Sequence, residues 1–163
     1  MIDYENIRNK VVDGLEEYLK KINPKCEVQR SNQDHEPPSY PYVSYTITTL
    51  QSENKGTWQV HEDGIERKAI TQTWSITILS DDNTESILLA SKAREWLDHT
   101  GTTYLNDNDI IVQSVTAITN RDNILTNGYE YRQGFDCFLW LYDEVENPIE
   151  EIGYIETVEF QNN

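Results

Sequence analysis

Apolar residues recur along the chain at two different spacings, and these spacings predict which segments are helices and which are strands. Apolar side chains three or four positions apart, the spacing of an amphipathic helix, run through 2–22 and 84–98. Apolar and polar side chains instead alternate over 42–50, 66–80, 109–119 and 129–143, with a shorter candidate strand at 25–30. Such alternation is typical of strands that bury one face of a sheet.

The order of these elements predicts the fold class. One helix comes first, then two or three strands, then a second helix and two long strands. This order predicts an α+β domain with a mainly antiparallel sheet and two helices packed on one face. One core against both helices should be lined by Ile70, Trp74, Ile76 and Ile78, and by Tyr131, Phe135, Leu139 and Leu141.

The length of 163 residues is typical of one domain. We predict a single α+β domain over residues 1–147. Residues 148–163 combine acidic side chains with scattered apolar ones. We therefore predict an acidic C-terminal tail or arm over this last segment.

The last long strand breaks the expected alternation on its even-numbered face. Phe138, Trp140 and Tyr142 are aromatic, although the odd-numbered face of the same strand is already apolar. Either the tail or a loop of the same chain covers them, or they contact another subunit, where buried aromatic side chains supply much of the binding energy. Trp58, which lies alone in the polar segment 51–64, has the same two alternatives.

The same strand carries a group of charged residues closer to its start. Glu130, Arg132 and Asp136 share one face, and neighbours two positions apart lie ~6.8 Å from each other. Arg132 can therefore bridge to Glu130 or to an acid on the next strand or subunit. The alternative is a solvated pair, which contributes ~0–1 kcal/mol.

The charge of the chain argues against several classes of partner. Thirteen basic and 29 acidic residues give a formal net charge of -16. Affinity for nucleic acid comes from clustered Lys and Arg, so no sequence-specific nucleic-acid binding is expected. An anionic membrane surface would repel the chain, and we expect neither a signal peptide nor a membrane segment.

Motifs for catalysis or for a cofactor do not stand out. His35, His61 and His99 are expected in loops and at a helix end, without the spacing of a metal site. No glycine-rich phosphate loop or serine nucleophile elbow occurs. Cys26 and Cys137 are expected to be free buried thiols. We therefore expect a protein that is not an enzyme, with no cofactor and no metal.

Two short runs are similar to a known family. Residues 128–139 read GYEYRQGFDCFL, and residues 40–45 read YPYVSY at the start of the first long strand. Together with the order of elements over nearly the whole chain, they resemble tailed-bacteriophage neck and tail-terminator proteins. The resemblance implies a tail-terminator-like fold and a structural role without catalysis.

The resemblance also implies partners and a location. Such subunits form a ring, often a hexamer, that caps the tail tube and docks the tail to the head connector. The partners would be further copies of the chain, the tail tube protein and a head-completion or connector protein. The location would be the virion neck or tail, after assembly in the bacterial host cytoplasm.

A different class of function remains as the alternative. An acidic binding or immunity-type module would use its charge to reach and mask a basic partner protein. For either class, the candidate interface residues are Trp58, Glu130, Arg132, Phe138, Trp140 and Tyr142.

Overall fold

A computed structural model describes residues 1–53, 58–126 and 128–146. The elements run in the order α1 (Tyr4–Lys20), β1 (Glu27–Arg30), β2 (Tyr42–Glu53), β3 (Gln59–Val60), β4 (Ile65–Ser80), α2 (Asn83–Glu95), a π-helical turn (Trp96–Thr100), α3 (Thr102–Asn106), β5 (Ile111–Val115), β6 (Thr119–Asn120), β7 (Asn123–Leu125) and β8 (Gly128–Glu146). This is the predicted α+β class with a mostly antiparallel sheet. The predicted tail at 148–163 lies outside the described residues.

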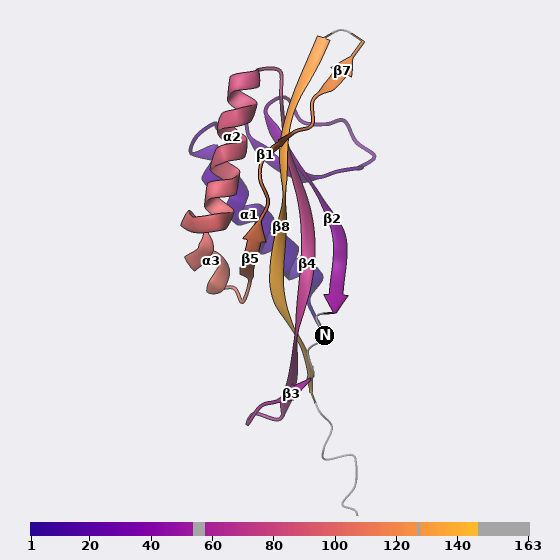
Figure 1. Ribbon diagram of the computed structural model, residues 1–163, viewed down its shortest axis with the longest axis vertical. Helices are drawn as coiled ribbons and strands as arrows, with labels where there is room; N and C mark the ends of the chain where they lie inside the picture. Colours follow the sequence, from indigo (N-terminus) through magenta and orange to yellow (C-terminus); the bar gives the residue numbers. More distant parts are fainter. Residues whose placement is uncertain (54–57, 127, 147–163) are drawn as a thin grey trace, which may run out of the picture.

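The sheet is built around two long strands. Its order is β1-β2-β4-β8-β5, with β3 added to β4, and with β6 and β7 added to β8. Only the β1–β2 pairing is parallel among the described strands. β4 and β8 pair from Ile65–Glu146 to Ser80–Tyr131. Figure 1 shows this pair running the length of the molecule, with β7 near one end and β3 near the other.

Both long helices begin at an aspartate that caps the first turn. The Asp3 carboxylate accepts a hydrogen bond from the Asn6 backbone N–H at 3.0 Å, and Asp82 accepts one from Glu85 N–H at 2.8 Å. Each bond satisfies a backbone donor that has no partner within the helix. The capped helices then bury apolar residues such as Leu15 of α1 and Leu89 of α2 against the sheet.

The core lies between the helices and one face of the sheet. Trp74, Ile76, Phe135 and Leu139 are fully or almost fully buried in one cluster with residues of α1, α2 and α3. The prediction of a single core is therefore confirmed. Tyr131 is an exception to the predicted list, because it is only partly buried and stacks on Tyr129 outside that cluster, at a centroid distance of 6.2 Å.

The helices differ from the prediction of two. The π-helical turn ends at Gly101, and the chain resumes directly as α3. Gly101 lies against the ring of Trp96, where a Cβ atom would overlap the indole. The absence of a side chain thus lets the short α3 fold back, and Leu105 of α3 joins the core.

The predicted strand 109–119 is also shorter than expected. β5 ends at Val115, and its register with β8 shifts between Val112 and Ser114. The shift places both Val112 and Val115 against the core, although simple alternation put them on opposite faces. A bulge of this kind is invisible to a pattern that assumes an unbroken period of two.

The two cysteines are both free and buried, as predicted. Burial raises the pKa of Cys26 and of Cys137 to about 12. Both thiols therefore stay protonated near neutral pH, and neither has the character of a reactive nucleophile.

Candidate interaction surface

The side of the sheet turned away from the core is the candidate surface, and we call it the open face. No described helix packs on it, because α1, α2 and α3 all join the core cluster on the other side. Its side chains alternate with the core residues of β2, β4 and β8. The residues of this face include Ser44, Thr46, Thr71, Thr73, Ser75, Thr77, Glu130, Arg132, Gly134, Asp136, Phe138, Trp140 and Tyr142.

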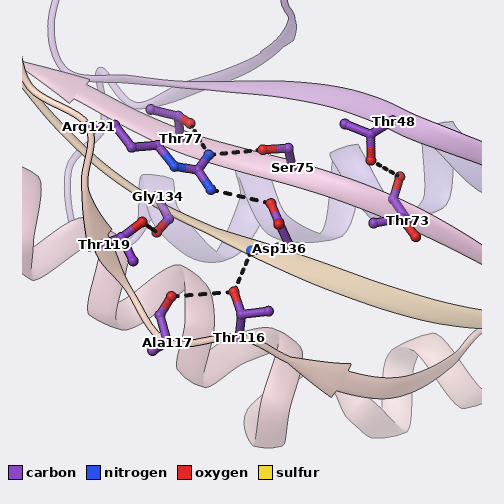
Figure 2. A network of polar contacts seen from close by, with 10 residues as sticks. All are labelled: Thr48, Thr73, Ser75, Thr77, Thr116, Ala117, Thr119, Arg121, Gly134 and Asp136. Atoms are coloured by element: carbon purple, nitrogen blue, oxygen red, sulfur yellow. Dashed lines mark hydrogen bonds and ion pairs between the residues drawn. The ribbon is translucent and has the colours of Figure 1, made fainter.

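One half of the open face is organised by Arg121. Figure 2 shows its guanidinium lying across β4 and β8. Nη1 donates to Ser75 Oγ at 2.9 Å and to Thr77 Oγ1 at 2.8 Å, while Nη2 pairs with Asp136 Oδ1 at 3.3 Å. The Arg121 backbone N–H also donates to the Arg132 carbonyl at 2.8 Å. One side chain thus ties the segment between β6 and β7 to both central strands.

Gly134 supplies the space that Arg121 occupies. A Cβ atom at this position would lie 2.7 Å from the guanidinium carbon, which is closer than van der Waals contact allows. The glycine and Asp136 both belong to the Gly-Phe-Asp run, and the Phe135 between them points into the core. Each residue of the run therefore has a physical role: Gly134 leaves room for Arg121, Phe135 is buried in the core, and Asp136 carries the opposite charge.

Replacing Arg121 with methionine is expected to lower the free energy of unfolding by about 1–2 kcal/mol. The change removes hydrogen bonds to two hydroxyls and one ion pair that is partly exposed to water. Urea denaturation measures the difference. Arg8→Met is the matched control, because Arg8 is similarly exposed but pairs only with exposed groups of its own helix.

The contribution of Gly134 can be separated in the same measurement. Gly134→Ala should displace the Arg121 guanidinium, so its cost should largely disappear when Arg121 is already methionine. Equal costs of Gly134→Ala in both backgrounds would show that the two residues act independently.

The second polar group of this surface surrounds a buried carboxylate. Glu130, for which the sequence left open either a bridge to Arg132 or a solvated pair, is only 5% exposed. It accepts a hydrogen bond from Arg132 Nε at 2.6 Å and another from the Tyr40 hydroxyl. Burial, and then the bond to Glu130, raises the pKa of Tyr40, which keeps the phenol protonated as a donor. The bridge between Glu130 and Arg132 is therefore present, in a more enclosed setting than the sequence indicated.

Arg132→Ala is expected to lower the free energy of unfolding by about 1–3 kcal/mol, because it leaves the buried Glu130 carboxylate with fewer donors. Thermal or urea denaturation measures the loss. In the double variant Arg132→Ala, Glu130→Gln, part of the stability should return, since no buried charge remains. A change below about 0.5 kcal/mol for Arg132→Ala alone would instead mark the pair as a solvated surface contact.

The other half of the open face is aromatic. Phe138, Trp140 and Tyr142 follow one another along β8, and we call them the aromatic row. Phe138 is half-buried, whereas Trp140 is 38% and Tyr142 is 47% exposed. Their paired residues on β4 are Thr73, Thr71 and Ala69, and on the other side of β8 Ile111 of β5 pairs with Trp140. Within the described residues, the second face of β8 is thus apolar and only partly covered.

Trp58 lies apart from the aromatic row. It is exposed beside β3, with Lys68 Nζ 6.0 Å from its ring centroid. On β4, Lys68 lies on the same face as Ile70, which is buried in the core, and therefore not on the open face. Trp58 therefore belongs to the opposite face of the β4–β8 pair.

The six residues chosen from the sequence consequently form three groups. Glu130 and Arg132 meet around Tyr40, the aromatic row lies about 20–40 Å further along β8, and Trp58 is on the other face. Sequence reasoning missed Tyr40 and Arg121. The Gly-Phe-Asp run was the signal that could have indicated Arg121. Its glycine leaves space beside the strand, and its aspartate offers a carboxylate to a basic side chain from another segment.

Neither a metal site nor a membrane-spanning helix is found among the described residues. No group of three His, Cys, Asp or Glu side chains among them is arranged to hold a metal ion. None of the described helices has the length and apolar character of a membrane span. Polar, charged and aromatic side chains exposed on a sheet face are instead typical components of a protein–protein contact.

Comparison with known proteins agrees with the resemblance seen in the sequence. A family model described as phage neck terminator protein matches residues 9–163. No curated protein sequence matches the chain.

Proposed function

The chain belongs to the family of phage neck terminator proteins, a structural family of the virion neck, and from this premise we propose that it forms a ring that caps the tail tube and joins the tail to the head connector. The direct partners in this proposal are further copies of the chain, the tail tube protein and a head-completion or connector protein. Assembly would take place in the cytoplasm of the bacterial host. No catalytic step and no cofactor belongs to this role.

The aromatic row is the observation that carries the proposal. Trp140 and Tyr142 expose large apolar rings on a sheet face that a lone domain would cover with polar groups. Tryptophan and tyrosine are the residues most enriched among those that dominate protein–protein binding energy. The row is therefore suited to be covered by another subunit.

The charge of the chain is compatible with a ring around passing DNA. At -16 per subunit, the inner surface of such a ring would repel DNA and would not hold it. A ring also needs two different contact patches on every subunit, because its interfaces join unlike surfaces. The open face and the projecting end of the β4–β8 pair beside β3 supply two such patches (Figure 1).

Self-association is expected to strengthen as salt rises. Like charges on neighbouring subunits repel, and salt screens that repulsion over about 8–10 Å at ionic strengths near 0.1–0.15 M. Sedimentation velocity from low to high salt, with and without isolated tail tubes, measures the effect. A nucleic-acid-binding protein would show the opposite dependence, since salt weakens contacts to phosphate.

Two outcomes would contradict the proposal. A protein that stays monomeric at every salt concentration and does not bind the ends of tail tubes does not act as a terminator subunit. A persistent monomer that binds a basic protein, and loses that partner as salt rises, would indicate the acidic binding module instead. Electron microscopy of the material that sediments fastest distinguishes rings from irregular aggregates.

A further inference from the structure

A polar cleft lies on the open face, between the central strands and the segment that joins β1 to β2, and we call it the open-face cleft. It has a volume of about 390 Å³. Its lining includes Ser44 and Thr46 of β2, Ser75 and Thr77 of β4, and Arg132 of β8. Ser44 pairs with Thr77, and Thr46 pairs with Ser75, across the two neighbouring strands. The hydroxyls of both strands therefore gather at one place on the same face.

The lining of the open-face cleft contains no acidic side chain. Acidic residues occupy 29 of the 163 positions in the chain, yet none of them lines this cleft. Three basic residues do line it: Arg30, His35 and Arg132. A carboxylate or another anion that enters the cleft therefore meets no like charge in the lining, although most of the charges of this chain would repel it.

The hydroxyls of Ser75 and Thr77 have hydrogens to donate. Both oxygens accept a hydrogen bond from Arg121 Nη1, at 2.9 and 2.8 Å (Figure 2). A guanidinium group only donates, so each hydroxyl keeps its own hydrogen for another acceptor. No acceptor for these two hydrogens is found among the described residues. Water can fill this role in the free protein, and the acceptor atoms of a ligand can replace the water.

Arg132 adds a charged donor whose position is fixed. Its Nε donates to the Glu130 carboxylate at 2.6 Å, and its Nη2 contacts the same carboxylate oxygen. Nη1 has no partner of this kind in the part of the chain that the structure describes. The buried Glu130 thus holds the guanidinium in place, while the Arg132 side chain remains 34% exposed. A donor that is positioned before binding loses little conformational freedom when a ligand arrives.

We propose that the open-face cleft is a binding site for an oxyanion, such as a carboxylate or a phosphate group, which accepts hydrogen bonds from Arg132 and from the hydroxyls of Ser75 and Thr77. An ionised carboxylate only accepts, and hydrogen bonds to a charged group are roughly twice as strong as neutral ones. Arg121 and Arg132 each hold one carboxylate already, so the cleft supplies donors without a surplus of positive charge. A small anion should therefore bind with a dissociation constant of roughly 1–10 mM.

The site adds to the proposed ring without depending on it. The cleft lies on the same sheet face as the aromatic row, so a second copy that covers this face would bring side-chain carboxylates to it. Two clefts cannot serve each other, because donors would then face donors. A contact through the cleft is therefore heterologous, as a ring requires. Two sources fit this chemistry: a side-chain carboxylate of another copy, and a free small anion.

Titration followed by NMR tests the site in the full chain. Acetate or inorganic phosphate replaces chloride at constant ionic strength. The backbone signals of Ser75 and Thr77 and the Nε–H signal of Arg132 should shift and saturate in the millimolar range. Arg132→Gln should weaken this binding roughly fivefold or more. Lys25→Gln removes the same charge from an exposed position outside the cleft and should leave the binding unchanged.

A carboxylate attached inside the cleft gives a second test that leaves Arg132 in place. Ser44 lies opposite Thr77, so Ser44→Asp brings a carboxylate beside the donors. The variant should abolish the shifts caused by acetate and phosphate, and it should raise the melting temperature by about 2–4 °C. Ser52→Asp adds the same charge to the exposed later part of β2, outside the cleft, and should do neither.

The same variants distinguish the two sources of the oxyanion. If Ser44→Asp also weakens self-association roughly tenfold or more, by sedimentation under conditions in which the wild type assembles, another copy supplies the carboxylate. If Ser44→Asp assembles as the wild type does, the source is a free anion. Cleft signals that respond to neither anion, or a Ser44→Asp variant that still binds both, would overturn the inference. A wild type that neither assembles nor binds tube ends contradicts only the proposed function, because the NMR titration needs no assembly.

Discussion

Replacing Trp74 with alanine is expected to remove about 3–5 kcal/mol from the free energy of unfolding, a large part of the roughly 5–15 kcal/mol that a domain possesses. Trp74 is 2% exposed at the centre of the sheet and stacks on Tyr45 with ring centroids 4.9 Å apart. Its Nε1–H donates to the buried Gln72 Oε1 at 2.7 Å. The truncation therefore leaves a cavity and also deprives a buried acceptor of its donor.

The two contributions can be separated by a second variant. Trp74→Phe keeps an aromatic ring against Tyr45 but removes the donor to Gln72, so it should cost clearly less than alanine. Urea denaturation with a two-state fit measures both values. A loss below about 1 kcal/mol for Trp74→Ala would mean that the core does not depend on this ring.

Replacing Trp140 with serine is expected to weaken self-association by about 2 kcal/mol or more, roughly thirtyfold in the dissociation constant, if the aromatic row forms the subunit contact. The fold should be nearly unaffected, with a change in unfolding free energy of roughly 1 kcal/mol or less, since the ring lies outside the core. Sedimentation at high salt measures the association, and denaturation of the same sample measures the stability.

Trp58→Ser probes the end of the β4–β8 pair beside β3 in the same measurement. Trp58 and Trp140 are both 38% exposed, but they lie on opposite faces of the β4–β8 pair. A loss of association in Trp58→Ser alone would move the contact to the region of β3. Equal and small effects of both substitutions would remove these two tryptophans from the interface.

The core was predictable because its pattern is local and regular. Ile70, Trp74, Ile76 and Ile78 share one face of β4, where the pattern is interrupted only by the polar Gln72, and all four are buried as the pattern predicts. The prediction fails where the period is broken. The register shift in β5 and the return of the chain at Gly101 depend on partners distant in the sequence, and a periodic pattern contains no information about them.

The candidate surface was predictable only in part. The aromatic row breaks the alternation of its own strand, so the sequence marks it directly. The roles of Arg121 and Tyr40 depend on which strands become neighbours, since each of them reaches residues far away in the chain. The open-face cleft is missed for a related reason, because its donors come from separate strands.

The central position of β8 has a consequence for the order in which the polypeptide can fold. β8 is the final described strand, yet it pairs with β4, β5, β6 and β7. Its pairing with β4 joins residues as distant in sequence as Ile65 and Glu146, a topology of high contact order that favours slow folding. Because a ribosome releases the N-terminal residues first, β4 can pair with β2 early, but its other edge must wait for β8 during synthesis. A subunit therefore acquires its open face only after nearly all of its described chain has emerged, which separates the folding of each copy from its incorporation into an assembly.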